Sequence, residues 1–123
     1  MEPGEILVVD DDPHVLKLFV RVLRASGYIV HEGRSGADAI RLLQEEQIDL
    51  MVLDLSMPEP DGFEVLTAIH AIRPELKILA VSGLIPADAL LKAAHLMGAT
   101  ATLNKAEAAT KLLGVVESLV KPS

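Results

Sequence analysis

Short runs of aliphatic residues alternate along the chain with longer segments in which apolar positions recur every three or four residues. Short runs rich in Val, Ile and Leu are typical of buried strands, and the longer period is typical of helices that pack one face against a core. The expected strands cover residues 6–9, 29–31, 50–53, 77–81 and 101–103. The pattern therefore predicts five strands, each followed by a helix.

Residues that start and stop helices support this division. Asp12 followed by Pro13 predicts the start of the first helix, because aspartate accepts hydrogen bonds from free N–H groups and proline fits the first turn. Gly27 is expected to end that helix. The starts expected for the next three helices are Ser35, Asp61 and Pro86. The inward-facing residues expected in the second and fifth helices are Ala37, Ile40 and Leu43, and Ala109, Leu112, Leu113, Val116 and Leu119.

The order of these elements predicts an α/β fold. The runs Ile6–Val9 and Met51–Leu53 are continuously apolar, as in central parallel strands that helices cover on both faces. Right-handed crossovers between such strands favour an open, doubly wound parallel sheet with helices on both faces. Sites in these sheets lie beyond the carboxyl ends of the strands, so functional residues are expected there.

Composition narrows the possible functions. The chain has 123 residues, half of them apolar, which predicts a single domain spanning residues 1–123. Its net charge of -7 argues against direct nucleic-acid binding, which needs clustered Lys and Arg. It has no Cys, no apolar stretch long enough to cross a membrane and no recognisable signal peptide, so a cytoplasmic location is expected.

Reactive residues follow four of the five predicted strands. Asp10 and Asp11 follow the first, Asp54 the third, Ser82 the fourth and Lys105 the fifth. Neighbouring first and third strands would place three carboxylates in one crevice, where like charges repel. Carboxylate oxygens without His or Cys suit a hard cation such as Mg²⁺. One carboxylate can then attack a phosphoryl group, while Lys105 and Ser82 stabilise the charge on its oxygens.

The motifs around these residues resemble the receiver domains of response regulators in two-component systems. The resemblance rests on Val8-Val9-Asp10-Asp11-Asp12-Pro13, on Leu53-Asp54-Leu55-Ser56-Met57-Pro58 with Asp61-Gly62, and on Gly98-Ala99 ahead of the lysine strand. It covers essentially the whole chain. It implies a flavodoxin-like (βα)5 sheet with strand order 2-1-3-4-5, an order that is known for a relative of this family.

The same resemblance implies a role for each site residue. Asp54 is the phosphoacceptor, Asp11 and Asp54 bind Mg²⁺ together with the Ser56 carbonyl oxygen, and Asp10 positions metal-bound water. Ser82 is the switch hydroxyl. The implied partners in this phosphorelay are a sensor histidine kinase or phosphotransfer protein, which donates the phosphoryl group, and an output protein or domain that the sequence does not identify. The resemblance also allows a homodimer through the last two helices and the fifth strand.

Four positions depart from the family pattern or vary within it. Thr102 stands where many receivers carry an aromatic residue whose rotamer changes together with the switch hydroxyl. Either the fourth helix and its preceding loop carry the signal alone, or the coupling between phosphorylation and output is weak. Ala106 replaces the proline that usually follows the lysine; we expect a trans peptide and a different loop before the fifth helix. Ser56 and Leu84 stand at variable positions where, in the family, residues affect how readily water attacks the acyl phosphate. Leu84 is predicted to shield the acyl phosphate from water and lengthen its lifetime.

Competing functions remain at this point. The leading hypothesis is a regulatory phosphoacceptor domain rather than an enzyme. A degenerate receiver that acts only as an unphosphorylated scaffold is the main rival, motivated by Thr102 and Ala106. An Mg²⁺-dependent aspartyl phosphatase would usually carry an acidic residue where Ser56 stands, and a flavin carrier would be repelled by the aspartates. Residues 121–123 are either the start of a linker or a natural C-terminus.

Overall fold

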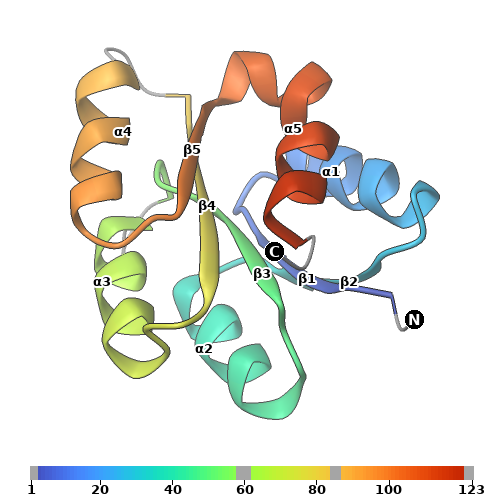
Figure 1. Cartoon of the computed structure of the whole chain (residues 1–123), viewed down its shortest axis with the longest axis horizontal. Helices are drawn as coiled ribbons and strands as arrows, with labels where there is room; N and C mark the ends of the chain where they lie inside the picture. The colour runs from blue at the N-terminus through green and yellow to red at the C-terminus, as the bar shows by residue number, and fades with distance from the viewer. Residues whose placement is uncertain (1–2, 58–61, 84–86, 121–123) are drawn as a thin grey trace.

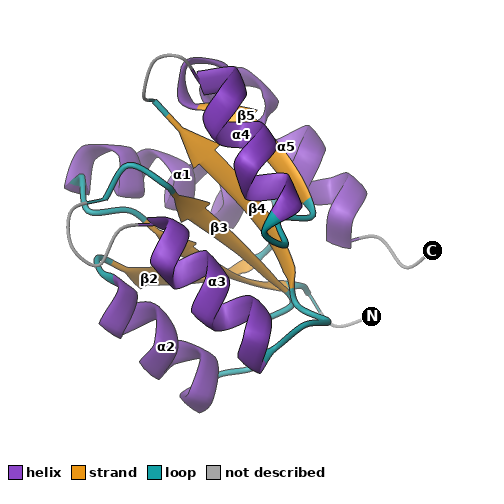
Figure 2. Ribbon diagram, turned by 90° about the vertical axis from the view of Figure 1, so that its left-hand side faces the viewer, coloured by secondary structure: helices purple, strands orange, loops and turns teal. Residues whose placement is uncertain are grey.

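A five-stranded parallel sheet forms the centre of the molecule, with helices on both of its faces (Figures 1 and 2). The computed structural model describes residues 3–57, 62–83 and 87–120. The strands are β1 (Glu5–Val9), β2 (Ile29–Gly33), β3 (Leu50–Asp54), β4 (Lys77–Ser82) and β5 (Ala101–Asn104). The helices are α1 (Pro13–Ala25), α2 (Gly36–Glu45), α3 (Gly62–Ile72), α4 (Ala87–Leu96) and α5 (Lys105–Val120).

The strand order is β2-β1-β3-β4-β5, which confirms the predicted order and the α/β fold. Each strand extends one or two residues beyond the predicted range. Asp54 and Ser82 are therefore the last residues of β3 and β4 rather than the first residues of the following loops. Because β1 and β3 are direct neighbours, the residues at their carboxyl ends lie at the same edge of the sheet.

Two apolar cores lie on the two faces of the sheet. On one face, α1 and α5 cover Ile6, Val8, Val52 and Val81. On the other face, α2, α3 and α4 cover a second set of strand residues that alternates with the first. The two helix layers are visible on opposite sides of the sheet in Figure 1. The central strands β1 and β3 are therefore buried from both sides, as their continuous apolar sequence predicted.

Helix boundaries agree with the predicted capping residues where the structure describes them. The Asp12 side chain accepts a hydrogen bond from the His14 N–H at 2.9 Å and caps α1. Ser35 caps α2 in the same way through Asp38 N–H. Gly27 follows α1 with a φ of 96°, a conformation that favours glycine. The starts predicted at Asp61 and Pro86 lie outside the described residues.

The predicted inward faces of two helices were partly wrong. Ala37 of α2 and Ala109 of α5 are exposed, and the buried positions in α2 are Gly36, Ala39 and Leu42. In α5 the buried alanine is Ala108. Both helices contain adjacent small or apolar residues, so more than one stripe fits the helical period, and the packing of the helix on the sheet selects between them. No helix in the described ranges combines the length and apolarity needed to cross a membrane.

Gly62, the first residue of α3, packs against the backbone that follows β3. A Cβ atom at this position would lie 2.3 Å from Leu55 Cα and 2.5 Å from the Asp54 carbonyl oxygen. These neighbours are backbone atoms and cannot move aside as the end of a flexible side chain could. A glycine here therefore lets α3 approach the chain segment that carries Asp54.

Replacing Gly62 by alanine should destabilise the protein by about 1 to 3 kcal/mol, because the added methyl group overlaps the backbone of Asp54 and Leu55. Gly114→Ala is the matched control, since nothing lies within 4 Å of a Cβ there and alanine favours the helix by about 0.5 to 1 kcal/mol. Urea unfolding of both variants checks this. Equal stability of the two variants would contradict the close approach at Gly62.

Candidate functional site

Asp54 lies at the carboxyl end of the most buried strand. All five residues of β3 are buried, and the Asp54 side chain shares this environment, with 3% of the residue exposed. The strand pairing continues on one side, where Leu55 N–H donates to the Val81 carbonyl at 2.8 Å. The surrounding sheet therefore fixes the position of the Asp54 backbone.

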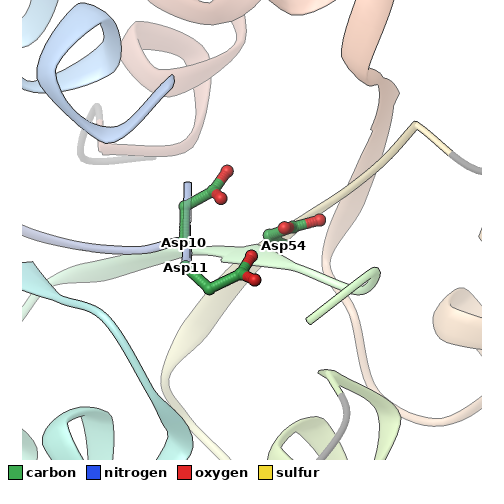
Figure 3. Close-up of side chains that lie close together, drawn as sticks. All are labelled: Asp10, Asp11 and Asp54. Atoms are coloured by element: carbon green, nitrogen blue, oxygen red, sulfur yellow. The ribbon is translucent and has the colours of Figure 1, made fainter. Parts of the chain in front are cut away.

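Asp10 and Asp11 follow β1, the neighbour of β3. Asp10 is buried, with 1% exposed, whereas Asp11 is exposed. Carboxylate oxygens of Asp10, Asp11 and Asp54 all lie within 4.8 Å of one another. Figure 3 shows the three side chains gathered at this edge of the sheet. The predicted acidic cluster is thus present in the structure.

The Asp10 carboxylate is held on both of its oxygens. Oδ1 accepts a hydrogen bond from Asp12 N–H at 2.9 Å. Oδ2 lies 3.1 Å from Lys105 Nζ, a charge contact rather than a well-directed hydrogen bond. Burial raises the pKa of Asp10 to about 6, and the nearby Asp54 adds to this, against the lowering effects of the Asp12 N–H and Lys105. The ionised form of Asp10 is therefore destabilised mainly by burial and further by the negative charge of Asp54.

Lys105 reaches the acidic cluster from the opposite end of the sequence. Its Nζ lies 3.3 Å from Asp54 Oδ2 in addition to its contact with Asp10. Burial by itself lowers the pKa of Lys105, but Asp54 and Asp10 together outweigh this effect and raise the pKa. The lysine is accordingly a cation at neutral pH, and it links two carboxylates that come from different strands.

The junction between β5 and α5 places Lys105 without an intervening loop. Lys105 is the first residue of α5 and directly follows Asn104, the last residue of β5. The Asn104 side-chain Oδ1 accepts a hydrogen bond from Ala106 N–H at 2.9 Å, as helix-capping residues do. A proline at position 106 would have no N–H to donate. In place of the loop expected before the fifth helix, the structure has a direct connection from β5 to α5 that Asn104 caps.

Gly83 provides space for the lysine stem. A Cβ at this position would lie 3.3 Å from Lys105 Cδ and 3.5 Å from Lys105 Cβ. The sequence reasoning missed both Gly83 and Asn104. Their signals were nevertheless available: a glycine directly after the fourth strand, and an asparagine directly before the fifth helix.

Ser56 holds the other oxygen of Asp54. Its backbone N–H and its hydroxyl both donate to Asp54 Oδ1, at 3.0 Å and 2.6 Å. The two oxygens of Asp54 therefore have different environments: Oδ1 is bonded within its own loop, and Oδ2 faces Lys105.

Ser82 lies in β4, beside β3, and Thr102 lies in β5, the edge strand next to β4. Ser82 is completely buried at the end of β4 and pairs in register with Asn104, while the preceding Val81 pairs with Asp54. Thr102 is half-buried and pairs with Ala80. Every predicted site residue is therefore at the carboxyl edge of the sheet. Leu84, predicted to shield this site, lies outside the described residues.

The donor set of the cluster fits a hard divalent cation. The acidic cluster contains only carboxylate oxygens, and Asp10 Oδ2 is buried without a well-directed hydrogen bond. Mg²⁺ favours such oxygen ligands and is commonly held by one or two carboxylates together with water and phosphate. A buried carboxylate with an adjacent ammonium group also suits the transfer of a phosphoryl group, which depends on positioning and charge stabilisation.

Comparison with known proteins identifies the relatives of this chain. "Transcriptional regulatory protein GlrR" of Escherichia coli (strain K12) is 40% identical over 87 residues, which are 69% of this chain and 20% of that protein. "Response regulator receiver protein CpdR" of Brucella abortus (strain 2308) is 38% identical over 78 residues, which are 63% of this chain and 65% of that protein. The chain thus spans about a fifth of the length of GlrR.

Solved structures of response regulators and their receiver domains have the same fold as this chain. A CheY-like receiver domain protein from Methanospirillum hungatei JF-1 superposes with a TM-score of 0.86 at 26% identity, covering 96% of this chain and 94% of that one. Response regulator TrrA from Thermotoga maritima, solved in complex with Mg²⁺ and BeF, superposes with a TM-score of 0.83 at 27% identity, covering 94% and 98%.

The family profile described as "Response regulator receiver domain" matches residues 6–117. This range includes most of α5 and every strand residue except Glu5 of β1. The chain therefore belongs to the receiver domain family of two-component response regulators.

Proposed function

We propose that Asp54 accepts a phosphoryl group from the phosphohistidine of a sensor histidine kinase or phosphotransfer protein, in a reaction that requires Mg²⁺. The observation that carries this proposal is the position of Lys105 Nζ, 3.3 Å from Asp54 and 3.1 Å from Asp10, beside three carboxylates within 4.8 Å of one another. This arrangement also argues against a degenerate scaffold, since the nucleophile, the acidic residues and the lysine are together despite Thr102 and Ala106.

Asp54 and Lys105 perform the transfer in this proposal. Asp54 Oδ2 attacks phosphorus, the bond between phosphorus and the donor nitrogen breaks, and the electron pair of that bond stays on the imidazole, which takes up a proton. The ammonium group of Lys105, which contacts Asp54 before the transfer, then contacts the new phosphoryl oxygens and stabilises their negative charge. Ser82, at the end of the adjacent strand, is proposed to engage the phosphoryl group and to signal its presence.

Asp10, Asp11 and Asp54, with the Ser56 carbonyl oxygen, are the residues that would hold Mg²⁺. Bound Mg²⁺ supplies positive charge that neutralises the repulsion between these carboxylates and the incoming phosphoryl oxygens. Phosphorylation would then change the surface that an output protein or domain recognises. In this proposal the domain is regulatory and takes part in its own phosphorylation and slow dephosphorylation.

Phosphorylation at Asp54 predicts a defined mass change. Incubation with acetyl phosphate and Mg²⁺ should add the mass of one phosphoryl group to the intact wild-type protein. Asp54→Asn should gain nothing, because an amide cannot act as the nucleophile, and wild type in excess EDTA should gain little. Intact-mass spectrometry measures all three. Absence of modification in the folded wild type would favour the unphosphorylated scaffold.

Asp10→Asn should stabilise the metal-free protein at pH 7 by about 1 to 2 kcal/mol, because it removes a buried negative charge beside Asp54 and keeps an oxygen for the Asp12 N–H. It should also reduce the stabilisation that Mg²⁺ gives, since binding to the folded state alone raises stability. Urea unfolding with EDTA and with Mg²⁺ checks both effects. Glu46→Gln removes the same charge from an exposed position and serves as the control. A loss of stability in metal-free Asp10→Asn would show that the buried charge of Asp10 does not destabilise the fold.

A further inference from the structure

We propose that two copies of this chain associate through the outer surface of α2, α3 and α4, as a two-fold symmetric dimer. In this dimer, Leu96 at the end of α4 enters the groove between α2 and α3 of the second copy. The surface differs from the one that the family resemblance implies, which uses the last two helices and the fifth strand. The inference does not depend on phosphorylation of Asp54, which lies at the other end of the sheet.

Three exposed apolar side chains lie at the carboxyl-terminal ends of α3 and α4. Ile72 ends α3 and is 65% exposed, Leu96 ends α4 and is 87% exposed, and the next residue, Met97, is 37% exposed. The two helix ends lie side by side, since a Cβ at Gly98 would lie 2.5 Å from His70 Cγ of α3. Exposed apolar side chains that gather in one place are typical of a surface that another protein covers.

An apolar groove between α2 and α3 adjoins these side chains. Its lining residues are Ile40, Leu43, Gln44, Ile69, Ile72 and Arg73. Four of the six are aliphatic, so the groove suits an aliphatic side chain. Because Ile72 belongs both to the groove and to the exposed apolar group, the chain carries a protruding leucine and an apolar hollow on one continuous surface.

The order of the three helices makes this surface complementary to itself. On one face of the sheet, α2 packs on β1 and β2, α4 packs on β4 and β5, and α3 lies between them (Figures 1 and 2). A two-fold axis along α3 therefore places α4 of each copy over α2 of the other. Both Leu96 side chains then meet a groove, as in interfaces where the same surface is used twice.

The charges on α2 and α4 suit the same arrangement. The last turn of α2 has no basic residue and ends at Glu45, where the negative end of the helix dipole adds to the acidic charge. Glu45 pairs with Arg41 of its own helix, but both side chains are more than half exposed, so Glu45 can accept a second cation. Lys92 is exposed and lies one turn before Leu96, on the same side of α4. It forms no ion pair with any residue in the described ranges.

Sedimentation equilibrium of the full chain, without Mg²⁺ or a phosphoryl donor, measures the association. The wild type should form a dimer with a Kd between about 10 and 500 µM, as expected for a small interface. Leu96→Gln should weaken the dimer by about tenfold or more, because it removes the side chain that fills the groove. Leu96 is exposed, so this substitution leaves the apolar cores intact. Leu18→Gln changes an exposed leucine of α1, on the opposite face of the sheet, and should dimerise like the wild type.

An exchange of charges tests which helices meet. Glu45→Lys and Lys92→Glu should each weaken self-association several-fold, because like charges then face each other across the dimer. An equimolar mixture of the two variants should associate at least as tightly as the wild type, since both contacts between α2 and α4 then join opposite charges. A dimer through the last two helices and the fifth strand would not be restored in this way, because Glu45 lies on α2.

Three results would each overturn the inference: a wild type that stays monomeric over this concentration range, a dimer that Leu96→Gln does not weaken, or a mixture that associates no better than the separate variants. A monomeric wild type would leave this surface to a different protein. Because these measurements use the unphosphorylated chain, they decide the dimer whether or not Asp54 accepts a phosphoryl group.

Discussion

The structure depends on one electrostatic compromise, in which two buried carboxylates share a single ammonium group. Asp10 and Asp54 are almost completely buried, and Lys105 Nζ lies within 3.3 Å of both. One positive charge does not balance two negative charges in a region of reduced dielectric. The pKa of Asp10 is raised to about 6, first by its burial and then by the negative charge of Asp54. Stability is therefore given up at the carboxyl edge of the sheet, and the site has a physical reason to bind a cation.

The parallel sheet makes this crowding tolerable. The apolar cores on its two faces fix the strands, so the backbones of Asp10 and Asp54 cannot move apart to relieve the repulsion. Gly62 and Gly83 reinforce the arrangement by letting α3 approach the Asp54 segment and by leaving space for the Lys105 stem. The packing of the whole domain thus maintains a local arrangement that would not persist in an isolated peptide.

Sequence patterns predicted the number, type and order of the elements because the central strands are continuously apolar and the helices begin at strong capping residues such as Asp12 and Ser35. The strand order itself came from family resemblance. Helix faces were harder: Ala37 and Ala109 were placed inside but are exposed, since neighbouring small residues fit the same period. The bond from Ser56 to Asp54 could not be predicted either, because it depends on a side-chain rotamer and on local loop geometry.

The direct passage from β5 into α5 has a mechanical consequence. Lys105 is both the residue after the last strand and the first residue of the last helix. The hydrogen bond from Ala106 N–H to the Asn104 side chain stabilises this connection. A longer, flexible loop would let the helix move without moving the ammonium group. Here a rigid tilt of α5 would also move the backbone of Lys105. The orientation of the C-terminal helix and the position of the ammonium group opposite Asp54 are therefore mechanically coupled.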